Sequence, residues 1–179
     1  MIPYLKADPE PFIVLSTGTW SICMNLFNES PLSAYDLERD CLHFLNIHGR
    51  TVKASRLFMG EEFKCQVQQL NECFHQSEQY HHGVRFDQTG YDRACQRGTG
   101  LFQKFHLNSS LYGYPNDGAF SPENFGSYED AYHQMVYELV LLQVESLKLV
   151  AWDSPAKKLC GWRFWAKPSI CADAATTIT

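Results

Sequence analysis

Ten residues near the start of the chain, Phe12 to Ser21 (FIVLSTGTWS), constrain its fold more than any other segment. Four apolar residues, two of them β-branched, predict a buried strand that runs directly into Ser16-Thr17-Gly18-Thr19. An extended run through Ile22 and Met24 follows. We therefore expect a β-hairpin whose tip is this turn of small hydroxyl residues.

A turn of this composition can bind phosphate. Gly18 allows a ligand to approach the backbone closely, while exposed N–H groups and the hydroxyls of Thr17 and Thr19 supply hydrogen-bond donors. Small-residue hairpin tips are common, however. On spacing alone, an ordinary turn with self-satisfied hydroxyls is the better explanation.

The wider segment FIVLSTGTWSICMN resembles the phosphate-binding hairpin that opens the second domain of the FGGY carbohydrate kinases, and it is most similar to the branch that includes rhamnulokinases and fuculokinases. Three later segments, NESPLSAYDLERD, CLHFLNIHGRTVKASRLFMG and SYEDAYHQMVYELVLLQVESL, resemble the same region. The similarity thus covers about Pro3 to Val150. It implies that Gly18 and Thr19, with Thr17 beside them, contact the terminal phosphates of ATP.

The resemblance also implies a fold class and a reaction. The fold would be α/β, part of an actin-like (ribonuclease-H-like) ATPase domain with β-hairpins and packed helices. The parent reaction would transfer the γ-phosphate of ATP to a sugar hydroxyl with the help of Mg²⁺. The nucleotide and the sugar would be the partners.

Local patterns predict further elements of such a domain. Residues 33–40 predict a short helix with Ser33 as N-cap and Asp36 at the capping-box position. Residues 42–52 predict a second hairpin that turns at His48-Gly49-Arg50. Residues 60–74 predict an amphipathic helix packed on a sheet, with Glu61, Glu62, Lys64, Gln68 and Gln69 mostly facing solvent.

The second half of the chain divides into an irregular stretch and a helix. Residues 75–127 show no sustained periodicity, so we expect loops, a turn at Gly98-Thr99-Gly100 and no metal site at His81 and His82. Residues 128–148 predict a long helix capped by Ser127, with apolar residues around much of its circumference.

Composition agrees with a cytoplasmic globular domain. The 179 residues are 45% hydrophobic and 14% aromatic, which argues against disorder, and no apolar run is long enough for a membrane span. The net charge of −5 offers no basic stripe, so we expect neither nucleic acid nor a membrane as a partner. The seven cysteines contain no Cys-x-x-Cys pair, which indicates reduced thiols.

The end of the chain departs from the resembled family. Residues 159–179 (LCGWRFWAKPSICADAATTIT) fit no strand followed by a helix, so we divide the chain into a partial kinase domain, 1–158, and an atypical tail, 159–179. Family members carry a glycine-rich VDGGF turn here. Because a one-base shift of the reading frame from Cys160 would allow V-D-G-G-F-G, we interpret the tail as a frameshift near Lys157-Lys158.

The beginning of the chain also departs from the resembled family. Members carry an N-terminal domain, with a first phosphate loop and a catalytic aspartate, before the position that matches Met1. We do not assign that role to Asp8, which is an ordinary turn acid beside Pro9. We therefore expect no catalytic residue and no activity from the chain alone. Uncovered apolar surface would lead to aggregation or to a partner, which could be a second copy in a homo-oligomer.

Two alternatives from other classes remain. A non-catalytic sugar-binding module would use exposed aromatic rings, with Tyr80, Tyr112, Tyr114 and Trp20 as the first candidates. A hydrolase would use Ser16 or Ser21, but the surrounding nucleophile elbow is absent from the sequence. Both rank below the kinase hypothesis. Aromatic loop residues are more often packing residues than sugar-binding residues, and a hydrolase would need the missing elbow.

Overall fold

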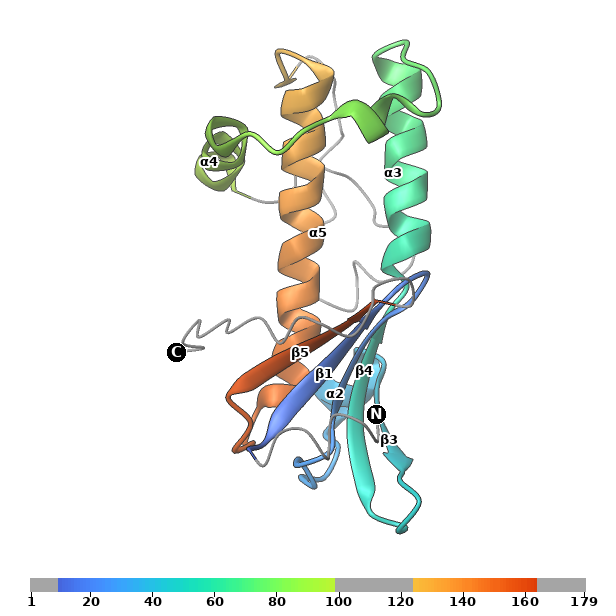
Figure 1. Cartoon of the computed structure of the whole chain (residues 1–179), viewed down its shortest axis with the longest axis vertical. Helices are drawn as coiled ribbons and strands as arrows, with labels where there is room; N and C mark the ends of the chain where they lie inside the picture. Colours follow the sequence, from blue (N-terminus) through green and yellow to red (C-terminus); the bar gives the residue numbers. More distant parts are fainter. Residues whose placement is uncertain (1–9, 99–123, 164–179) are drawn as a thin grey trace. The chain divides into compact units, whose positions relative to one another are not determined.

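The computed structural model describes residues 10–98 and 124–163, which divide into two compact units (Figure 1). The sheet unit contains the described residues 10–57 and 144–163. The helical unit contains the described residues 58–98 and 124–143. The chain therefore combines strands and helices, as an α/β class requires.

The sheet unit is built on five strands in the order β3-β4-β2-β1-β5. The strands are β1 (Phe12–Thr17), β2 (Ser21–Asn25), β3 (Cys41–Leu45), β4 (Thr51–Leu57) and β5 (Lys158–Arg163). Antiparallel pairing joins β1 to β2, β2 to β4 and β3 to β4, so both predicted hairpins are confirmed. Strand β1 continues through Ser16 and Thr17, which shortens the expected turn to residues 18–20.

Strand β5 includes the first residues of the expected tail. Residues 158–163 pair in parallel with β1, from Phe12 opposite Lys158 to Thr17 opposite Arg163, and the sequence analysis did not predict this strand. The segment lacks an alternating apolar pattern, and its partner strand lies near the other end of the chain. Cys160 is nevertheless buried against Phe12 and Val14 in the core. The remainder of the expected tail, 164–179, lies outside the described residues.

Helix α5 (Tyr128–Ala151) runs from the helical unit into the sheet unit, where two buried asparagines bind its last turn. Asn25 Nδ2 donates to Val150 O at 2.8 Å and to Ser154 Oγ at 2.8 Å. Asn28 Nδ2 donates to Val150 O at 2.9 Å and to Trp152 O at 2.8 Å. These side chains satisfy carbonyls that a helix end leaves without intrahelical partners, and they fix the turn that leads into β5.

Lys53 on β4 is a cation buried inside the sheet unit, with a side chain only 2% exposed. Its Nζ lies 3.2 Å from Asp36 Oδ1 on α2 (Ala34–Glu38). Ser33 caps this helix in the predicted capping box with Asp36. Burial raises the pKa of Asp36, but hydrogen bonds from Ser33 and the nearby Lys53 ammonium outweigh it, so the pKa lies below its ordinary value.

The helical unit contains α3 (Met59–Cys73), the short 3₁₀ helix η1 (Tyr80–Gly83), α4 (Gln88–Arg97) and the first part of α5 (Figure 1). Within this unit, α3 contacts α5, since Tyr128 Oη donates to Asn71 Oδ1 at 2.9 Å. Glu62 is buried instead of facing solvent. Its carboxylate accepts a hydrogen bond from Gln66 Nε2 at 2.8 Å.

Helix α4 lies in the stretch that we expected to be loops. Asp87 caps it, since its carboxylate accepts a hydrogen bond from Gly90 N at 2.8 Å. Gly98 ends it with a φ of +80°, a conformation that favours glycine. Thr99 and Gly100, the rest of the expected turn, lie outside the described residues. The expectation of loops was therefore wrong for this segment, although both ends of the helix have ordinary capping residues.

The cysteines of the described residues differ in their exposure. All six cysteines among the described residues are free; Cys23, Cys41 and Cys160 are buried, whereas Cys95 is exposed. No helix in the described part of the chain combines the length and the apolar character that crossing a membrane requires.

The asparagine contacts at the end of α5 generate a stability prediction. Asn28→Asp keeps the shape and the acceptor oxygen that binds Ser30, but it turns the two donated hydrogen bonds into oxygen–oxygen repulsion. We expect a loss of about 3 kcal/mol in the free energy of unfolding, measured in urea at pH 7.

Asn46→Asp is the matched control. Asn46 lies in the β3–β4 turn, where its Oδ1 accepts from His48 N and Arg50 N, a role that aspartate retains. This variant should stay within about 0.5 kcal/mol of the parent chain. Equal losses in both variants would contradict the role given to Asn28.

Candidate functional site

The β1–β2 hairpin projects its tip into solvent. Thr17, Gly18, Thr19 and Trp20 are all exposed, whereas Ser21, the first residue of β2, is 1% exposed. The last register pair before the turn joins Ser16 to Ile22. The three residues predicted to bind phosphate therefore lie together and are exposed to a ligand. The regular antiparallel pairing of β1 with β2 holds them in place.

Gly18 is not required by the fold of the chain itself. Its φ lies outside the left-handed region, and a Cβ built there would meet only the carbonyl oxygen of Trp20, at 3.9 Å. Conformational freedom therefore does not explain this glycine, whereas its lack of a side chain would let another molecule approach the backbone closely.

The tip lies where several strands end. Strand β1 ends at Thr17 opposite Arg163, the last residue of β5. Strand β4 ends at Leu57 opposite Ser21. In open α/β sheets, ligands bind beyond the carboxyl ends of the strands. We call this side of the sheet, with the β1–β2 tip and the ends of β1, β4 and β5, the hairpin edge.

An arginine that the sequence analysis missed lies at the hairpin edge. Arg56 precedes the last residue of β4, and its guanidinium carbon lies 5.5 Å from the centroid of the Trp20 ring. Arg56 Nη2 also lies 2.6 Å from Asp40 Oδ1. Only the pairing of β2 with β4 brings Arg56 beside the tip, so no local sequence signal could have identified it.

The residues proposed for the two alternatives are partly committed to packing. The Tyr80 hydroxyl donates to Glu129 at 2.7 Å, an interaction that raises the pKa of Tyr80, and its ring packs edge-on against Tyr128 at 4.8 Å. Tyr112 and Tyr114 lie outside the described residues. Ser21 is buried, which does not suit a nucleophile.

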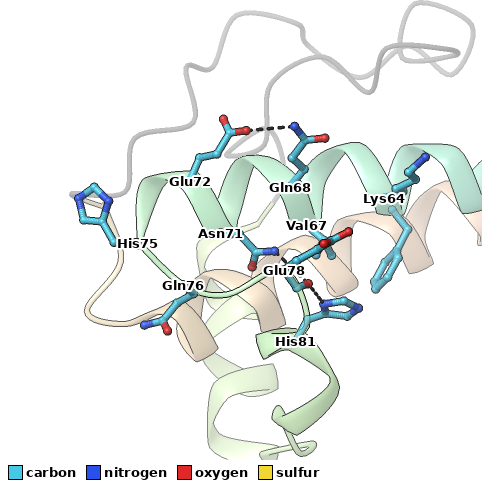
Figure 2. Close-up of a pocket in the computed structure, with 10 residues that line it drawn as sticks. Lys64, Val67, Gln68, Asn71, Glu72, His75, Gln76, Glu78 and His81 are labelled. Carbon is cyan, nitrogen blue, oxygen red and sulfur yellow. Dashed lines mark hydrogen bonds between the residues drawn. The ribbon is translucent and has the colours of Figure 1, made fainter.

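The helical unit contains a cavity of about 660 Å³ between residues of α3 and the segment that follows it (Figure 2). Some of its polar side chains bind one another or the backbone. Gln68 Nε2 donates to Glu72 Oε1 at 3.0 Å, and Asn71 Nδ2 donates to Glu78 O at 3.3 Å. His81 Nδ1 lies 3.2 Å from the same carbonyl oxygen.

The described residues contain no cluster of three side chains suited to a metal ion. His81 and His82 lie side by side, with ring centroids 4.0 Å apart, and no third ligand among the described side chains joins them. At the hairpin edge, the Asp40 carboxylate is engaged by Arg56.

Comparison with known proteins decides the family. The family model "Carbohydrate kinase FGGY, C-terminal domain" matches residues 9–110, which is more than half of the chain. The chain belongs to the FGGY carbohydrate kinase family. The matched residues include the whole β1–β2 hairpin, β4 and α3, so the hairpin edge is largely part of the FGGY domain. Among curated proteins, a search finds no match.

Solved structures show the fold of this FGGY domain. A xylulose kinase from Bifidobacterium adolescentis matches with a TM-score of 0.53 and 12% identity, over 91% of this chain and 31% of its own. A carbohydrate kinase from Novosphingobium aromaticivorans matches with a TM-score of 0.49 and 18% identity, over 86% and 32%. The chain thus spans about a third of the length of these kinases. The expected α/β fold of a partial actin-like ATPase domain is confirmed.

The open space around Gly18 leads to a stability prediction for the β1–β2 hairpin of this FGGY domain. Gly18→Ala should leave the free energy of unfolding within about 1 kcal/mol of the parent value, because the added methyl group meets no close neighbour. Gly49→Ala, in the β3–β4 turn at a φ of +73°, should lose about 1 kcal/mol or more. Urea unfolding measures both. A larger loss at Gly18 than at Gly49 would mean that the fold itself requires the glycine.

Proposed function

We propose that the chain is part of the C-terminal domain of an ATP-dependent carbohydrate kinase, and that the hairpin tip binds the terminal phosphates of ATP. The observation that carries the proposal is the exposed Thr17-Gly18-Thr19 turn at the carboxyl ends of parallel strands. Its glycine is not needed by the fold, and its N–H groups and hydroxyls suit phosphate oxygens. The family match supports a sugar as the phosphate acceptor.

The proposed role of the tip is positioning. Phosphoryl transfer depends on holding the terminal phosphates in line with the acceptor and on stabilising the charge that spreads over their oxygens. Thr17 and Thr19 donate hydrogen bonds to those oxygens, while Gly18 permits close contact with the backbone. Mg²⁺ would neutralise part of the phosphate charge. Because the described residues form no metal site, we assign no ligand of this ion to them.

Several finer features belong to the same proposal. The branch is that of the rhamnulokinases and fuculokinases, on the similarity of the STGTW segment and its flanks. The chain alone does not transfer phosphate, since the Asp40 carboxylate at the hairpin edge is paired with Arg56 and cannot readily serve as the base. Sugar-dependent ATP turnover by the purified chain would contradict this.

The division of the chain is also a proposal. Strand β5 begins at Lys158, so the change of reading frame would fall inside the strand, and residues 159–163 would still belong to the sheet. Sequencing the encoding DNA tests the idea. Codons for VDGGF in a shifted frame at Cys160 would support it, and their absence would overturn it.

The phosphate-binding role predicts how affinity depends on the ligand and on Thr19. The chain should bind ATP more tightly than AMP, because the contacts are to terminal phosphates. Thr19→Val should weaken ATP binding about tenfold, since a hydrogen bond to a charged oxygen is lost, and should leave AMP binding unchanged. Isothermal titration calorimetry measures all four affinities.

Thr51→Val provides the matched control. Thr51 is the first residue of β4, at the end of this strand away from the hairpin edge, so its hydroxyl is not available to a ligand at the tip. Its ATP affinity should equal that of the parent chain. Equal affinity of the parent chain for ATP and AMP would contradict the proposed function. Sugar binding that does not respond to nucleotide would instead favour a sugar-binding module.

A further inference from the structure

The hairpin tip has hydrogen-bond donors but no charge of its own, whereas the ligand proposed for it carries several negative charges. Residues 17–20 (TGTW) are all neutral. Lys53, on the same strand as Arg56, is buried and paired with Asp36, so it cannot reach a ligand in solvent. Arg56 is different, because its side chain is 36% exposed and lies beside the tip.

Two contacts hold the Arg56 guanidinium without using all its donors. The Trp20 ring lies 5.5 Å from it, and Asp40 accepts a hydrogen bond from Nη2 at 2.6 Å. Nε is buried and makes no hydrogen bond, so the N–H groups left for a ligand are those of Nη1 and the second one of Nη2. A guanidinium has five N–H donors in a planar fork that matches phosphate oxygens, so this side chain retains capacity for a further anion.

The backbone around this pair is fixed independently of the Arg56 side chain. Arg56 N donates to Asp40 O at 3.2 Å, and Asp40 N donates to Leu37 O at 3.2 Å. Asp40 itself has a φ of +54°, a conformation that Asp and Asn adopt more readily than other side chains do. Both charges can therefore be changed while the turn is kept: Arg56 to an uncharged residue of similar length, and Asp40 to Asn.

We propose that Arg56 is a phosphate-binding residue of the hairpin edge, and that Asp40 and Trp20 are positioning residues that hold its guanidinium beside the tip. This assignment rests on the proposed function. The Asp40 carboxylate occupies Nη2 and competes with the phosphate for it, while the Trp20 ring keeps the guanidinium over the hairpin. The site thus joins neutral donors from one hairpin to a cation from β4.

Tripolyphosphate is the probe, because it carries terminal phosphates without adenine or sugar. With the full chain at low ionic strength, Arg56→Met should weaken its binding about tenfold or more. Arg56→Lys should recover only part of the loss, since an ammonium lacks the planar fork. Asp40→Asn should strengthen binding about threefold, because the competing carboxylate is gone.

Two variants at the other end of β4 control for net charge. Arg50 Nη2 and Glu29 Oε1 form an exposed ion pair there, at 2.7 Å. Arg50→Met repeats the charge change of Arg56→Met, and Glu29→Gln repeats that of Asp40→Asn. Both controls should bind tripolyphosphate as the parent chain does. Equal effects at the two ends of the strand would reduce the result to net charge and overturn the assignment.

The remaining outcomes separate this assignment from the proposed function. If the parent chain binds tripolyphosphate and neither Arg56→Met nor Asp40→Asn changes the affinity, the Arg56 role is overturned while the hairpin function stands. If the parent chain does not bind the probe, both are overturned. If Arg56→Met unfolds, Asp40→Asn decides: a stronger affinity supports the assignment, because a purely structural ion pair would not produce it, and an unchanged affinity overturns it.

Discussion

The architecture of the sheet unit depends on how the last turn of α5 is held. Asn25 and Asn28 extend from β2 and the residues after it, and both donate hydrogen bonds to the Val150 carbonyl. Helix ends leave carbonyls without intrahelical partners, and burying them unsatisfied would be costly. With both side chains in place, the helix ends inside the unit without that cost, and the chain reverses through the Ser154 turn into β5.

This reversal creates the hairpin edge. Because β5 leaves the turn alongside β1 and in the same direction, the two strands end next to each other, at Thr17 and Arg163. The β1–β2 tip then stands at the carboxyl ends of parallel strands, the place where open α/β sheets bind ligands. The contacts at the end of α5 thus contribute to placing β5 beside β1, where the two strands end together.

The sequence predicted elements that depend on local signals. The β1–β2 hairpin follows from an apolar run and a small-residue turn, and α2 follows from the Ser33–Asp36 capping box. Helix α4 and strand β5 were missed, because the first has a polar sequence and the second is recognisable only beside β1. The burial of Glu62 was missed because a hydrophobic pattern assigns polar residues to the surface, and both Glu62 and its hydrogen-bond partner Gln66 are polar.

The candidate site likewise contains residues that the sequence predicts and residues that only the structure identifies. Thr17, Gly18 and Thr19 are adjacent in sequence, so a motif could suggest them. Arg56 and Asp40 reach the tip only through the register of β2 with β4 and through the turn before β3. Residues of this second kind require a structure, because neither their spacing nor their types distinguish them from ordinary surface charges.

A titration of the ¹⁵N-labelled chain with ATP, followed by NMR, shows whether phosphate binds at the hairpin tip. If it does, the amide signals of Gly18, Thr19 and Trp20 should shift most, together with the side-chain Nε–H signal of Arg56. Shifts confined to residues that line the cavity beside α3, such as Gln68 and His75, would contradict it.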